Sequence, residues 1–125
     1  MKTSQLLPYL GAALSVGWGI AHLIPTRNVV AGFGGISEDN RNIIAMEWII
    51  EGVALIFIGV LVTVVTYIDP INSVSTAVYT VVTVTLLALA VVAFFTGFKV
   101  KFLPFRLCPF VLSLSALLIA FGGII

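Results

Sequence analysis

Charged residues are scarce in this sequence, which contains six Lys or Arg and five Asp or Glu among its 125 residues. A net charge of +1 without a basic stripe offers little to a phosphate backbone, so we do not expect a nucleic-acid partner. The scarcity of charge, together with a hydrophobic fraction of 61%, is instead typical of an integral membrane protein. We predict a single membrane domain over residues 1–125, surrounded by the lipid bilayer.

Cysteine and histidine are rarer still, with one residue of each type, Cys108 and His22. A single cysteine cannot form an internal disulfide, and we interpret Cys108 as a small buried apolar residue. A single histidine excludes bis-His haem binding within one chain, and the Glu-x-x-His pairs of di-iron bundles are missing. The nucleophile elbow of a Ser-His-Asp hydrolase is missing as well. The sequence therefore predicts no metal site, no catalytic residue and no required cofactor, and an enzyme is the least favoured function.

Long apolar stretches are what the sequence does have, and each is long enough to cross the roughly 30 Å hydrocarbon core as a helix. Pro25, Asp69-Pro70 and the proline-broken segment 99–109 separate them. The pattern predicts an all-α fold class, a four-transmembrane-helix bundle in up-down-up-down order. The expected spans lie at about residues 5–24, 43–68, 73–98 and 107–124.

The second helix is expected to begin before the membrane does. Ser37 has the chemistry of an N-cap, and Glu38 and Asp39 suit the positive end of the helix dipole. From Glu38 to Ile68 the helix would be about 46 Å long at 1.5 Å per residue, so its first turns should stand in water.

Small residues recur every four positions in the first span, at Gly11, Ser15 and Gly19. Such a small-xxx-small series lets a neighbouring membrane helix approach closely. His22 falls near the same side of that helix, so it should face protein and not lipid.

Lys and Arg are concentrated in the loops at residues 25–42 and 99–106 and at the start of the last span. The positive-inside rule then places these two loops in the cytoplasm and both termini outside, in a multi-pass plasma-membrane protein. The basic residues concerned are Arg27, Arg41, Lys99, Lys101 and Arg106.

Two carboxylates, Glu47 and Glu51, stand inside an otherwise apolar run. They are four residues apart, so they share one face of a helix, and acids at such depth are costly and often functional. The predicted topology places His22 and Arg106 in the same half of the bundle. We therefore predict a cluster of ligand-binding or proton-relay candidates, namely Glu51, His22, Glu47 and Arg106.

Three interpretations of this cluster compete, in decreasing weight. The first is a structural ion-pair network in which Arg106 and His22 neutralise the glutamates. The second is a pocket for a quinone headgroup or another small polar-headed ligand. The third is a proton- or cation-coupled carrier that works as a homodimer. Glu51, the deeper acid, is the better candidate for a site, and Glu47 nearer the boundary for a structural anchor.

The segment Gly19-Ile20-Ala21-His22-Leu23-Ile24-Pro25, followed later by Glu51-Gly52 and an aliphatic run, resembles the DoxX-like family of small bacterial four-helix membrane proteins. The resemblance implies a bacterial inner-membrane protein, and some members of that family sit beside redox enzymes. That family includes the small subunit associated with thiosulfate–quinone oxidoreduction. This chain departs from the family in an additional acid, Glu47, and in the end of its third span, which lacks the expected proline or asparagine. The resemblance therefore implies only a site role for His22 and Glu51, and not the quinone chemistry of the family.

The leading functional hypothesis is a small, non-enzymatic membrane protein, an accessory or quinone-binding subunit of a membrane redox system. Its expected partners are a second copy of the chain or a membrane redox protein. The alternative hypothesis is a dimeric proton- or cation-coupled transporter of small molecules.

Overall fold

Each of the four apolar stretches forms a helix in the computed structural model, which describes residues 3–125. All four are long and apolar enough to cross a membrane. The predicted all-α bundle is confirmed, and its four long helices have the length and composition of a multi-pass membrane protein. The helices are α1 (Thr3–Leu23), α2 (Thr26–Ala31), α3 (Glu38–Ile68), α4 (Ser73–Gly97) and α5 (Leu103–Gly123).

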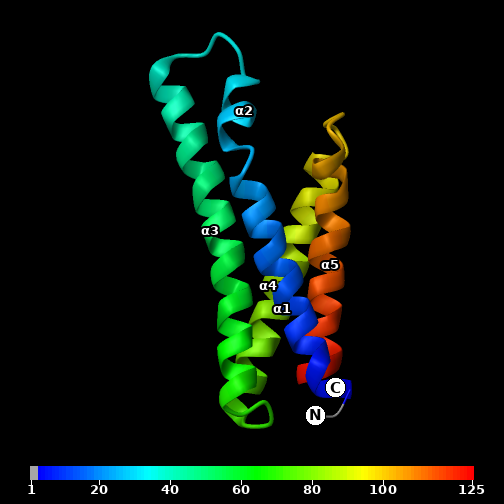
Figure 1. The fold of residues 1–125 in the computed structure, drawn as a ribbon. Coiled ribbons are helices and arrows are strands. Elements are labelled where there is room, and N and C mark those ends of the chain that lie inside the picture. The colour runs from blue at the N-terminus through cyan, green and yellow to red at the C-terminus, as the bar shows by residue number, and fades with distance from the viewer. Residues whose placement is uncertain (1–2) are drawn as a thin grey trace.

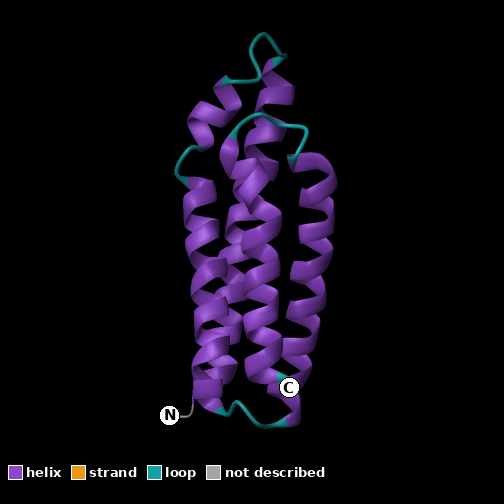
Figure 2. Ribbon diagram, turned by 90° about the vertical axis from the view of Figure 1, so that its right-hand side faces the viewer, coloured by secondary structure: helices purple, strands orange, loops and turns teal. Residues whose placement is uncertain are grey.

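The long helices alternate in direction along the bundle (Figure 1, Figure 2). One end, called the turn end, holds the start of α1, the Asp69–Asn72 connection and the end of α5. The opposite end, called the loop end, holds α2 and the connection at residues 98–102. The chain therefore runs up, down, up and down between these two ends, as predicted.

Side-chain caps fix the starts of α3 and α4. The Ser37 hydroxyl accepts a hydrogen bond from the Asn40 amide at 3.2 Å, which confirms the predicted N-cap. At the other end of α3, Asp69 precedes Pro70, which cannot continue the helix. The Asn72 side chain then caps α4 by accepting from the Ser75 amide at 2.9 Å. These caps make the connection between α3 and α4 short and tight.

Two details at the loop end differ from the sequence-based expectation. The last helix begins at Leu103 and not at about 107, because Pro104 lies in the first turn, where a missing N–H is tolerated. Pro109 lies inside α5 and does not interrupt it. The short helix α2, which packs on α3, was not predicted.

Small residues allow α1 to pack tightly between α3 and α5. A Cβ added at Gly59 would lie 2.5 Å from the Ala12 carbonyl oxygen, so the two backbones are nearly in contact. On the other side of α1, the Ser115 hydroxyl donates to the Gly11 carbonyl at 2.7 Å. The predicted role of the small-residue series is thus confirmed.

The buried hydroxyl of Ser15 ties α1 to α3 by donating to the Leu55 carbonyl at 2.7 Å. We expect Ser15→Ala to lower the free energy of unfolding by about 1 kcal/mol, because one interhelical hydrogen bond is lost. Thermal unfolding in detergent micelles measures the change. Thr80→Ala is the matched control, because the exposed Thr80 hydroxyl bonds only to Thr76 in its own helix. Equal losses in the two variants would contradict the assignment.

Candidate functional site

A pocket of about 500 Å³ lies between the four long helices at the loop end. Its volume falls within the range of roughly 300–1,000 Å³ that small-molecule sites occupy. Aromatic and aliphatic side chains make most of the wall, including Trp18, Trp48 and Phe105. Ligand sites in proteins have this composition, with a few polar groups in an apolar enclosure. The polar side chains of the lining are His22, Glu51, Thr96 and Cys108.

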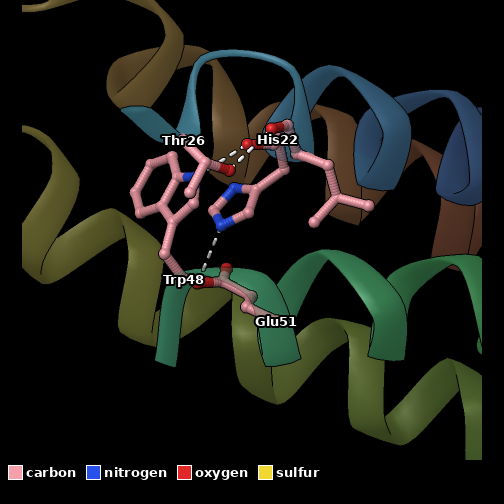
Figure 3. Close-up of polar contacts among 5 residues, drawn as sticks. His22, Thr26, Trp48 and Glu51 are labelled. Carbon is pink, nitrogen blue, oxygen red and sulfur yellow. Dashed lines mark hydrogen bonds and ion pairs between the residues drawn. The ribbon is translucent and has the colours of Figure 1, made fainter. Parts of the chain in front are cut away.

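The end of α1 builds the first wall of the pocket. The last carbonyls of a helix lack helical donors, and Pro25 has no N–H to give. The Trp48 indole N–H donates to the His22 carbonyl oxygen at 2.7 Å, and the Thr26 hydroxyl donates to the Leu23 carbonyl at 2.6 Å. The end of α1 is therefore capped by side chains from α2 and α3 (Figure 3).

The imidazole of His22 is held between Trp48 and Glu51 (Figure 3). It stacks on the Trp48 indole with ring centroids 3.8 Å apart and planes inclined by 17°. Trp48 therefore fixes both the backbone and the ring of His22. Trp48 in turn contacts the Phe105 ring of α5 at a centroid distance of 5.6 Å. These contacts hold the imidazole in one orientation before any ligand arrives.

Glu51 lies at the Nε2 edge of the His22 ring, with Oε2 at 3.5 Å from Nε2. This separation is an ion-pair contact but exceeds the 2.7–3.2 Å of an ordinary N–H···O hydrogen bond. Within residues 3–125, Nε2 accordingly has no hydrogen-bond partner, although the atom is buried. The His22 side chain is 11% exposed and the Glu51 side chain 52%. A buried nitrogen with unused hydrogen-bonding capacity thus stands beside an accessible carboxylate.

The structure does not bring Glu47 and Arg106 into this arrangement. Glu47 is exposed, lies outside the pocket lining and forms no ion pair with any described residue. The side chain of Leu23, the last residue of α1, packs against Gly52, which follows Glu51 directly and lies five residues after Glu47. Arg106 is also exposed, and its Nε donates to the Val100 carbonyl at 3.1 Å. Of the four predicted candidates, only His22 and Glu51 meet.

The sequence-based reasoning missed the aromatic wall, and Trp48 above all. Trp48 precedes Glu51 by three residues, so the two side chains share one side of α3. A second missed feature is the close approach of Gly97 to the Phe105 carbonyl oxygen, where any Cβ would collide. Pro109, four residues later, has no N–H to give that carbonyl. The helical spacing of Trp48 and Glu51 was the one signal available beforehand.

The chemistry of the pocket follows from its two ionisable groups. The His22 ring nitrogen can donate or accept a hydrogen bond, and the ionised Glu51 carboxylate accepts. Together they can hold the polar head of one ligand and pass a proton to it. In the described part of the chain, no three His, Cys, Asp or Glu side chains gather as a metal site would require. No protein-family model, curated protein or solved structure matches this chain.

Proposed function

We propose that this protein binds a ligand of the quinone class, with a planar polar ring and an apolar tail, in the pocket beside His22 and Glu51. In this proposal it serves as an accessory subunit of a membrane redox system. The observation that carries the proposal is the unpartnered, buried Nε2 of His22 next to an accessible carboxylate in an otherwise apolar pocket. Electron transfer belongs to the partner protein, and this chain holds and positions the ligand.

The donors and acceptors of the pocket suit both forms of such a ligand. A quinone oxygen accepts a hydrogen bond, which a protonated His22 nitrogen can give. A hydroquinone hydroxyl donates one, which the Glu51 carboxylate can accept. The rings of Trp18, Trp48 and Phe105 line the same pocket and favour a guest with a flat ring. These features support a ring-shaped headgroup over a flexible polar one.

We further propose a DoxX-like protein of the bacterial inner membrane, with the loop end in the cytoplasm and both termini outside. The resemblance of the His22 and Glu51 segments supports the family. Five of the six Lys and Arg residues lie at the loop end or in the first turns of α3 and α5 beside it. This asymmetry supports the orientation through the positive-inside rule.

Tryptophan fluorescence provides the direct test, because the chain has two tryptophans and both line the pocket. A short-tailed ubiquinone analogue titrated into the protein in detergent should quench this emission saturably. We expect His22→Ala to raise the dissociation constant of the quinone about tenfold, since it removes the hydrogen bond to the quinone oxygen. We expect Glu51→Gln to raise that of the reduced hydroquinone form about tenfold, since it removes the charge that strengthens the hydrogen bond from the hydroxyl.

Glu47→Gln is the matched control, because it neutralises an acid on the same helix that does not line the pocket. Its dissociation constant should equal that of the unmodified protein. Unchanged binding in both His22→Ala and Glu51→Gln would refute the proposal. A purely structural His22–Glu51 pair predicts lower thermal stability in these two variants and no saturable quenching at all.

A further inference from the structure

The contacts between α3 and α4 are concentrated at the turn end. The hydroxyls of Thr66 and Tyr79 are hydrogen-bonded at 2.9 Å, and both side chains are buried. One turn closer to the connection, the Ser75 hydroxyl donates to the carbonyl oxygens of Asp69 and Val65, at 2.5 and 3.3 Å. All the hydrogen bonds between α3 and α4 in the described chain lie in this region. The two helices are therefore joined near Asp69–Asn72.

At the loop end each of these helices has a different partner. α3 packs against α1 there, since Gly52 contacts Leu23 and the Trp48 indole is hydrogen-bonded to the His22 carbonyl. α4 stays with α5, because Gly97 lies against the Phe105 carbonyl. Figure 1 shows α3 and α4 close together near their connection and apart at the opposite end. The helices therefore diverge as they approach the pocket.

The exposure of side chains along α4 follows this divergence. Residues seven positions apart lie on nearly the same side of a helix. On one such line, Ser75 is 2% exposed and Val82 is 4% exposed near the turn end. Further along the same line, Leu89 is 38% exposed and Thr96 is also exposed, and both line the pocket. The side of α4 that is covered near the turn is thus open beside the pocket.

The pocket is apolar where it approaches the loop end. Pro25 and Val29 line it from the first connection and α2, and Phe102 and Pro104 from the second connection and the start of α5. These groups do not attract a water-soluble ligand. On α4 the exposed edge of the pocket carries Leu89 and Val92, which suit contact with acyl chains, and Thr96, whose hydroxyl is bonded to the Val92 carbonyl in the same helix. The lining therefore favours access from lipid over access from water.

We propose that the pocket opens sideways into the bilayer between α3 and α4, and that its occupant is an amphiphile dissolved in the membrane. The headgroup passes this side opening and reaches His22 and Glu51, and the tail remains between Val92 and the edge of α3. The identity of the headgroup rests on the proposed quinone-binding function. The route rests on the divergence of α3 and α4 and is tested without a quinone.

The test reconstitutes the full chain in phosphatidylcholine vesicles whose acyl chains carry bromine, a short-range quencher of tryptophan. We expect brominated lipid to quench Trp18 and Trp48 strongly, and iodide in the water to quench them little. Trp18→Phe and Trp48→Phe variants assign the quenching to each residue. Strong quenching by iodide with none by brominated lipid would overturn the side opening.

A matched pair of variants separates the side opening from general contact with lipid. Val92 lines the pocket and Val91 does not, although both are exposed on α4. Val92→Phe should obstruct the opening and reduce quenching by brominated lipid, and Val91→Phe should leave it unchanged. Equal quenching in both variants would contradict the inference. If brominated lipid quenches as expected but no quinone binds, the side opening between α3 and α4 is supported and the proposed quinone ligand is refuted.

Discussion

Replacing Gly59 with leucine is expected to lower the free energy of unfolding by about 3 kcal/mol, because the new side chain overpacks the α1–α3 interface. A Cβ at this position would already lie 2.5 Å from both the Ala12 carbonyl oxygen and the Val16 Cγ2 atom. The carbonyl belongs to the backbone of α1, so it can yield only if the whole helix moves. Thermal unfolding in detergent measures the loss.

Gly17→Leu is the matched control for this substitution. Gly17 lies in α1 as well, but a Cβ added there would have no neighbour within 4 Å. We expect this variant to unfold at or above the temperature of the unmodified protein, since glycine is a poor helix former. Gly59→Ala, which adds only a methyl group, should lose about 1 kcal/mol and remains measurable if the leucine variant does not accumulate. Equal stability of the Gly59 and Gly17 variants would refute the close approach of α1 and α3.

Replacing Trp48 with alanine is expected to weaken quinone binding about a hundredfold, because it removes a hydrogen bond and an aromatic stack together. The hydrogen bond fixes the backbone of His22, and the stack fixes its ring. Trp48→Phe keeps an aromatic face but loses the N–H donor, so its loss should be nearer tenfold. Quenching of Trp18, which remains in both variants and lines the pocket, provides the measurement.

Phe57→Ala serves as the control for removing an aromatic side chain from α3. Phe57 is exposed and lies outside the pocket lining. Its removal should leave the dissociation constant unchanged. If Trp48→Ala bound quinone as tightly as Phe57→Ala, the proposal that Trp48 positions His22 would be wrong.

The bundle was predictable because apolar length is a strong signal in membrane proteins. A stretch long enough to cross the bilayer must satisfy its backbone internally, which leaves a helix as the solution for such a chain. Ser37 and the series Gly11, Ser15 and Gly19 could be assigned for a similar reason, since each feature depends on local chemistry and helical spacing. The start of α5 could not, because Pro104 and Pro109 are compatible with either a turn or a helix.

The pairing of His22 with Glu51 was predictable only in part. The predicted depth of each residue and its predicted half of the bundle selected four candidates, namely His22, Glu47, Glu51 and Arg106. Their actual neighbours depend on how far α1 extends along α3, and no local pattern encodes that distance. Because the last turn of α1, from Gly19 to Leu23, packs on Gly52, the imidazole of His22 lies beside Glu51, and Glu47 lies about one turn further along α3. Trp48 was overlooked because a tryptophan in a membrane helix also serves as an interfacial anchor.

The contact between α1 and α3 also means that Glu51 and His22 can meet early in synthesis. These are the first two long helices of the described chain, and N-terminal segments are made and fold first. The contacts between His22 and Trp48 therefore need only α1 and α3, and neither α4 nor α5 contributes to them. A helical hairpin of α1 and α3 alone already contains both Glu51 and its imidazole partner. The two later long helices, α4 and α5, supply the remaining walls of the pocket around this polar pair.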